Sequence, residues 1–256
     1  MAFRQVNFEH LAKFNSEASS ILINKYKDQL IANIQSECAG PKSCTFAPSS
    51  MRCNRKSWFR LRGTQPDFIA EPDLVLSHTA VVGTALHEHI QSVLEQAFGA
   101  DWVSVEDYLK ENPIPYKYVL TQNGHETLVE IPEIPIKFAC DGILRIHGKF
   151  YLLEIKSSEY NSWDKLTTTK PHHMDQIETY STILNIPNVL TLYVDRQFGD
   201  VKSYEHTIPL EHMIAVNDRI AYVKRMVEMN LAPDRLPVDD YMCLNCEYKT
   251  KCKEWG

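Results

Sequence analysis

The 256-residue sequence lacks the long apolar run of a membrane-spanning helix, since no stretch approaches the roughly 18–20 apolar residues that such a span requires. Its first residues, MAFRQVNFEH, also lack the apolar segment typical of a signal peptide. These two features argue against a membrane or secreted protein, and we expect a cytoplasmic one. The length suits one large domain or a core with additions.

An excess of positive charge is also missing, because 33 acidic residues outnumber 27 lysines and arginines and the net charge is −6. A local patch can nevertheless matter more than the total. The densest basic stretch is RCNRKSWFRLR, residues 52–62, in which Trp58 and Phe59 interrupt five cations. Two interpretations stay open for it: an amphipathic helix with a solvated basic face, or a phosphate-binding surface on which the aromatic rings stack bases.

A disulfide framework is not expected, because seven cysteines is an odd number and cytoplasmic thiols stay reduced. Three of the cysteines, Cys243, Cys246 and Cys252, crowd the segment CLNCEYKTKC. Three thiols are one ligand short of a tetrahedral zinc site or an iron–sulfur site. The missing ligand must come from far upstream, and the basic stretch offers Cys53.

Apolar periodicity predicts helices separated by a group of strands. Helices are expected over residues 12–37, 78–99, 104–111, 171–185 and 209–230, with a further helix carrying the basic stretch and capped by Ser49 or Ser50. Strands are expected over residues 116–121, 126–131, 134–146, 149–156, 189–195 and 201–208. This order predicts an α/β fold with a mixed sheet and appended helices.

Acidic residues interrupt the hairpin FACDGILRIHGKFYLLEIKSS, residues 138–158. If His147 and Gly148 form a two-residue turn, the register places Asp141 directly opposite Glu154. Opposed side chains in an antiparallel pair have Cβ atoms roughly 4.5–5.5 Å apart. Two carboxylates that close repel each other unless they share a proton or a cation.

Asp141, Glu154 and Lys156 together form a candidate divalent-metal site. A nearby ammonium can orient an attacking water and stabilise negative charge on a phosphate. The alternative is a salt-bridged strand face in which Lys156 satisfies both acids. His87 is a candidate further ligand, whereas His89 lies about 200° around the helix and is expected to face solvent.

Six motifs, in the correct order from about residue 46 to 252, resemble the RecB-type nucleases of the PD-(D/E)XK superfamily. They are FAPSSMRCNRKSWF, GTALHEHIQ, CDGIL, EIKSS, QIETYSTIL and CLNCEYKTKC. The closest resemblance is to the iron–sulfur branch, which includes the CRISPR-associated RecB-like exonucleases, the nuclease domain of AddB and many phage exonucleases. The family's CPY after the first CxxC reads CEY here, but all four thiols remain.

This resemblance implies a PD-(D/E)XK restriction-endonuclease-like mixed sheet flanked by helices, in a single nuclease domain. The expected parts are an N-terminal helical region (1–77), the nuclease core (78–208) and a C-terminal helix with the iron–sulfur segment (209–256). Mg²⁺ or Mn²⁺ would be bound by His87, Asp141, Glu154 and the carbonyl of Ile155, with Lys156 as the catalytic lysine.

The resemblance further implies a [4Fe–4S] cluster on Cys53, Cys243, Cys246 and Cys252, with zinc as the alternative. The expected DNA-contacting residues are Arg52, Arg55, Lys56, Trp58, Arg60, Gln176 and Tyr180, of which the last two contact DNA or brace the site. Cys38 and Cys44 have no role in this pattern.

The implied activity is metal-dependent hydrolysis of DNA by an exonuclease acting on single strands or ends. Recombination, repair, phage DNA processing and CRISPR adaptation are the settings in which the family works, with possible protein partners from those pathways. A structure-specific or restriction-type endonuclease and a non-catalytic DNA-binding subunit are the alternatives. An intact acidic pair with its lysine argues against the pure binder, and the absence of GxxxxGK[ST] argues against a helicase motor.

Overall fold

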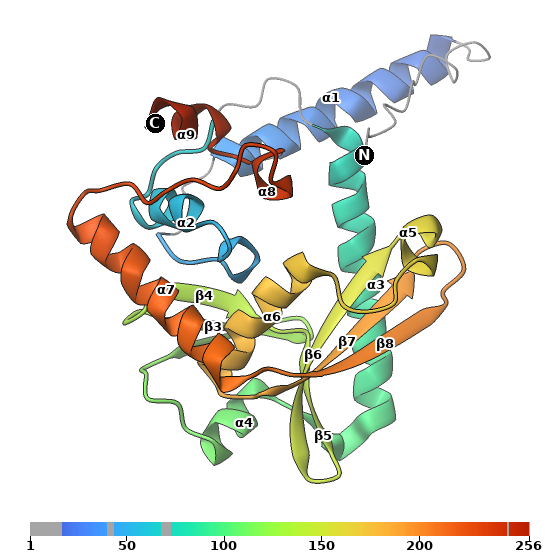
Figure 1. Ribbon diagram of the computed structural model, residues 1–256. Coiled ribbons are helices and arrows are strands. Elements are labelled where there is room, and N and C mark those ends of the chain that lie inside the picture. The colour runs from blue at the N-terminus through green and yellow to red at the C-terminus, as the bar shows by residue number, and fades with distance from the viewer. Residues whose placement is uncertain (1–16, 40–43, 68–72, 245, 256) are drawn as a thin grey trace.

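The computed structural model describes residues 17–39, 44–67, 73–244 and 246–255. It contains a five-stranded sheet in the order β1-β5-β6-β7-β8 and a three-stranded sheet in the order β2-β3-β4, with helices packed around them (Figure 1). This is the mixed α/β architecture that the sequence predicts, and it is consistent with a PD-(D/E)XK-like fold. None of the described helices combines the length and the apolar content needed to cross a membrane.

The centre of the five-stranded sheet is the hairpin of β5 (Gly142–Ile146) and β6 (Lys149–Ser158). β7 (Asn188–Asp195) runs parallel to β6, and β8 (Val201–Thr207) closes one edge in antiparallel fashion. A parallel pair requires a crossover connection, which α5 (Tyr160–Asp164) and α6 (Pro171–Leu184) provide. The short strand β1 (Trp102–Val103) pairs with β5 at the other edge.

The predicted turn at His147 and Gly148 is confirmed. Both residues have positive φ, 49° and 74°, as a two-residue hairpin turn demands. The ladder of β5 and β6 ends with Gly142 opposite Leu153, so its next step places Asp141 opposite Glu154. The register inferred from the sequence is therefore correct.

The predicted single strand over 134–146 is wrong, because the chain leaves one sheet and enters the other within it. Its first part is β4 (Ile136–Ala139), which pairs with β3 (Glu126–Ile131), and β3 pairs with β2 (Val119–Asn123). The break falls at Cys140 and Asp141. Asp141 therefore lies at the junction between the two sheets.

Helices cover both faces of the five-stranded sheet. α3 (Leu74–Phe98) begins at the N-cap Asp73 and packs Ile90, Leu94 and Phe98 against one face. The helix predicted over 78–99 is confirmed, although Val82 and Val93 on it are half exposed. α6 and α7 (Leu210–Glu228) contribute to the main core on the other face.

The remaining helices lie outside these layers. α4 (Val105–Glu111) begins at the N-cap Ser104, as predicted. α1 (Glu17–Ala39) confirms most of the expected N-terminal helix, and residues 12–16 of that prediction lie outside the described residues.

The basic stretch forms α2 (Asn54–Leu61), which lies beside the C-terminal helices α8 (Tyr241–Leu244) and α9 (Lys249–Glu254) (Figure 1). The predicted serine cap is wrong, because Pro48–Ser50 forms a separate 3-10 turn. Cys53 caps α2 instead, and its sulfur accepts the Lys56 N–H at 3.4 Å.

Candidate functional site

Asp141 is held from three sides at the junction of the two sheets. Its Oδ2 accepts the backbone N–H of Ile155 at 2.5 Å, and its backbone carbonyl accepts the side-chain amide of Gln91 at 2.9 Å. Its Oδ1 lies 3.7 Å from Nδ1 of His87 on α3. The carboxylate is thus fixed in orientation, with Oδ1 facing His87 and Oδ2 facing β6.

Glu154 lies on β6 with only 1% of its surface exposed. Its Oε1 contacts the ammonium of Lys156, while its Oε2 has no hydrogen-bond partner. Burial, and then the negative charge of Asp141, raise the pKa of the Glu154 carboxyl to about 7. A buried carboxylate oxygen without a partner is costly.

The Lys156 ammonium contacts one carboxylate oxygen, Oε1 of Glu154. Burial alone would lower the pKa of its ammonium, but the charges of Glu154 and Asp141 outweigh burial and raise it. A raised Lys156 pKa presupposes an ionised Glu154, whereas Glu154 itself resists ionisation, so the two side chains compete for one proton. We assign the proton to Lys156, because the intrinsic pKa of an ammonium lies roughly six units above that of a carboxyl.

These residues fit a hard divalent cation. Such ions take carboxylate and carbonyl oxygens as ligands and keep open positions for water and phosphate. The unpartnered Oε2 of Glu154 and Oδ1 of Asp141 are donors of that type. The alternative interpretation, a strand face on which Lys156 satisfies both acids by salt bridges, does not account for the missing partner of Glu154 Oε2.

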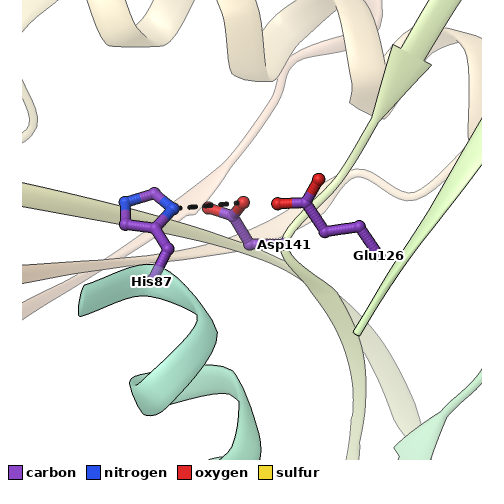
Figure 2. Close-up of side chains that lie close together, drawn as sticks. All are labelled: His87, Glu126 and Asp141. Atoms are coloured by element: carbon purple, nitrogen blue, oxygen red, sulfur yellow. Dashed lines mark ion pairs between the residues drawn. The ribbon is translucent and has the colours of Figure 1, made fainter. Parts of the chain in front are cut away.

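The tightest gathering of metal-ligating atoms in the described residues is formed by His87, Glu126 and Asp141, whose ligand atoms all lie within 4.8 Å of one another. Figure 2 shows Asp141 between the other two side chains. Glu154 does not belong to this group. His89 is exposed, as expected.

Glu126, the first residue of β3, was missed by sequence reasoning. Burial, and then the charge of Asp141, raise the pKa of its carboxyl. The ladder of β3 and β4 ends with Leu128 opposite Ala139, and two further steps place Glu126 opposite Asp141. Working out this second register would have identified it, but the expected strand over 134–146 hid where β4 ends.

Gln176 and Tyr180 brace the site. Gln176 accepts a hydrogen bond from the Lys156 ammonium at 3.4 Å and donates one to the Tyr180 hydroxyl at 2.6 Å. Tyr180 is buried and stacks on Phe138, with ring centroids 5.1 Å apart. Of the two roles predicted for Tyr180, this burial favours bracing of the site over contact with DNA, since only 4% of the residue is exposed.

The expectations for the basic stretch also need correction. Trp58 has no exposed surface and donates its indole N–H to the Met226 carbonyl, so it cannot stack a base. Arg55 is 5% exposed, and its guanidinium donates to the carbonyls of Pro233 and Cys252 at 2.6 and 3.3 Å. The side chains of Trp58 and Arg55 are therefore part neither of a solvated basic face nor of a phosphate-binding surface.

Three other cations of this stretch have acidic partners, whereas the Arg62 guanidinium lies over the rings of Trp58 and Trp255. Lys56 and Arg60 both approach Glu247, at 3.8 and 3.5 Å. Arg52, whose side chain is 42% exposed, pairs with Asp240. Much of the positive charge of this stretch is therefore neutralised by the C-terminal segment.

Four cysteines from the two ends of the chain line one cavity of about 60 Å³: Cys53, Cys243, Cys246 and Cys252. They are free thiols. Among the described residues, no three of their sulfur atoms all lie within 4.8 Å of one another.

Comparison with known proteins finds similar solved structures but no matching sequence family. No family model matches the sequence, and neither does any curated protein. Among solved structures, SSO0001 is 18% identical with a TM-score of 0.49, covering 92% of this chain and 98% of that one. An alkaline exonuclease from Laribacter hongkongensis, LHK-Exo, is 15% identical with a TM-score of 0.46, covering 74% and 90%, and its complex with dAMP gives the same values. At this level of similarity the functional assignment has to come from the site itself.

Proposed function

We propose that this protein is a divalent-metal-dependent DNA nuclease. The observation that carries the proposal is the buried carboxylate of Glu154, whose Oε2 has no partner although it lies beside Lys156 and opposite Asp141. A cation held between the two acids removes their repulsion and supplies the missing partner. His87, Asp141, Glu154 and the Ile155 carbonyl are the proposed ligands.

Each residue has a distinct proposed role in phosphodiester hydrolysis. The cation supplies Lewis-acid polarisation of the phosphate and a lowered pKa for bound water. Asp141 and Glu154 bind the cation, and the Ile155 N–H fixes the Asp141 carboxylate. Lys156 stabilises charge that develops on the phosphate, and Gln176 orients the Lys156 ammonium from α6.

The choice of DNA, and of free ends or single strands, rests on the ordered motifs that resemble RecB-type exonucleases. A role in recombination, repair, phage DNA processing or CRISPR adaptation, with protein partners to match, is the corresponding biological proposal. Of the expected DNA contacts, we retain Arg52 and Gln176, since the Arg52 side chain is more exposed than those of Lys56 and Arg60 and Gln176 is half buried beside Lys156.

We further propose that the four cysteines bind a [4Fe–4S] cluster. Each thiolate of such a cluster binds a different iron, so the sulfurs lie farther apart than around one zinc ion. The cluster would join the N-terminal region (1–77) to the C-terminal segment (209–256), on either side of the nuclease core (78–208). Its role would be structural, because it fastens α2 to α9.

Activity on an end-labelled single strand tests the nuclease proposal. Wild-type protein with Mg²⁺ or Mn²⁺ should shorten the strand, and EDTA should abolish the reaction. Asp141→Asn and His87→Ala should each lower the rate about a hundredfold or more, because each loses a metal ligand. His89→Ala is the matched control on the same helix and should retain the wild-type rate. Equal rates for all four proteins would refute the assigned site.

A further inference from the structure

Asp141 lies between the ends of two β-ladders that belong to different sheets, since one ends at Ala139 and the other at Gly142. The β5–β6 ladder, continued by one step, brings Glu154 opposite it, and the β3–β4 ladder, continued by two steps, brings Glu126 opposite it. One aspartate is therefore faced by an acid from each sheet. No such convergence follows from the hairpin 138–158 alone.

The Glu126 carboxylate has no cation to neutralise it among the described residues. The groups that act on it are Asp141, His87, Gln91 and Glu88, none of which is a lysine or an arginine. Glu126 nevertheless points toward Asp141 and His87 (Figure 2). Two acids held together beside an imidazole, with no lysine or arginine among the groups that act on Glu126, leave an electrostatic cost that a divalent cation would remove.

The two acids that face Asp141 lie in different surroundings. Glu154 is buried and shares its Oε1 with Lys156, so it reaches a cation from the β6 side. Glu126 is half buried at the tip of the β2–β3 hairpin, and its ligand atom lies within 4.8 Å of those of Asp141 and His87. Glu126 thus adds a donor to a group to which Glu154 does not belong.

We propose that Glu126 is a further ligand of the cation bound by His87 and Asp141, so that cation binding fastens the tip of the β2–β3 hairpin to α3 and to the five-stranded sheet. The ligand class is a hard divalent ion, Mn²⁺ or Mg²⁺, since the donors are two carboxylates and one imidazole. This proposal rests on the proposed function, and it adds a ligand that the ordered motifs do not include.

The hairpin tip also contacts α3 through His125, which supplies a matched control. Nδ1 of His125 lies 3.0 Å from Oε2 of Glu95, and both side chains are exposed. Glu95→Gln weakens this contact without removing any proposed ligand. Its effect on the hairpin measures loosening of the tip alone.

Mn²⁺ binding to the full-length protein, measured by the loss of the free-ion EPR signal, tests the ligand directly. Glu126→Gln should weaken Mn²⁺ binding by roughly tenfold or more, since even the loss of an outer partner of a metal ligand costs about 10–100-fold. Glu126→Asp keeps the charge and should recover part of the affinity, while Glu95→Gln should stay within about twofold of the wild type. Circular dichroism of each variant verifies that it is folded.

Hydrogen exchange of residues 119–131 gives a second readout that does not depend on catalysis. Mn²⁺ should slow exchange across the hairpin in the wild type and in Glu95→Gln, but not in Glu126→Gln. If Glu126→Gln binds Mn²⁺ as the wild type does while Asp141→Asn does not, the proposed function stands and the role of Glu126 is refuted. If the wild type binds no Mn²⁺, both proposals fall.

Discussion

Replacing Lys156 by methionine separates the electrostatic role of this lysine from its space-filling role. Glu154 is 1% exposed, and the Lys156 ammonium is the cation that contacts it. Removing one partner of a buried ion pair typically costs about 3–5 kcal/mol, because the other charge is left unpaired. We expect roughly 3 kcal/mol here, the low end of that range, since the Lys156 side chain keeps 19% exposure.

In a chain of this length, 1 kcal/mol corresponds to roughly 2–4 °C in Tm, so Lys156→Met should melt roughly 6–12 °C lower in EDTA. Mg²⁺ or Mn²⁺ should raise the Tm of Lys156→Met more than that of the wild type, because a bound cation replaces the lost positive charge. The nuclease rate should nevertheless stay at least about a hundredfold below the wild type even with saturating metal.

Lys202→Met is the matched control on β8, which is separated from β6 by β7 in the same sheet. Its ammonium donates to the carbonyls of Trp163, Asp164 and Leu166 and contacts no acid of the site. This variant should lose some stability, show no enhanced response to metal and keep its nuclease rate. If Lys156→Met melts like the wild type in EDTA and responds to metal no more strongly, Glu154 is not the buried charge that this reasoning requires.

Three further predictions concern the cysteines, the buried side chain of Arg55 on α2 and the histidine His173. Anaerobically purified Cys53→Ala should lose the brown colour and visible absorption expected of the wild type and melt lower, whereas Cys44→Ala should keep both; a colourless wild type with one bound zinc would refute the cluster. Arg55→Met should be destabilised by about 1–3 kcal/mol in urea unfolding, because it leaves buried carbonyls unpaired, and unchanged stability together with weakened DNA binding would return Arg55 to the DNA surface. Burial, and then the charge of Lys156, lower the pKa of His173 to about 2, so the unfolded chain binds the proton more readily, and stability should fall as pH drops below about 6.5 by up to roughly 1 kcal/mol per unit. His173→Gln should flatten that slope, and an unchanged slope would exclude His173 as its source.

The sequence predicts those parts of the fold and site that depend on local rules. A positive-φ turn at His147 and Gly148 fixes the β5–β6 register, and that register alone brings Asp141 opposite Glu154. The helix starts at Asp73 and Ser104 follow ordinary capping chemistry, although only the second was expected.

The parts that the sequence does not predict depend on partners that are distant along the chain. The strand pattern over 134–146 is continuous, and only pairing with β3 decides that it breaks at Asp141. In the basic stretch, the spacing of charges gives no sign that Arg55 binds the Pro233 carbonyl or that Trp58 binds the Met226 carbonyl. From sequence alone, a polar side chain on a helix is predicted to face solvent, because a hydrogen-bond acceptor far along the chain cannot be identified.

The most direct test of the central claim compares linear and circular single-stranded DNA of the same sequence, incubated with the protein and Mg²⁺ or Mn²⁺. We predict that the linear strand is shortened progressively, that the circle stays intact, and that Asp141→Asn and EDTA stop the reaction. Cleavage of the circle would support an endonuclease on the same site. If neither DNA is cleaved with either metal, although Mn²⁺ binding is measured, the proposal that this site hydrolyses DNA is contradicted.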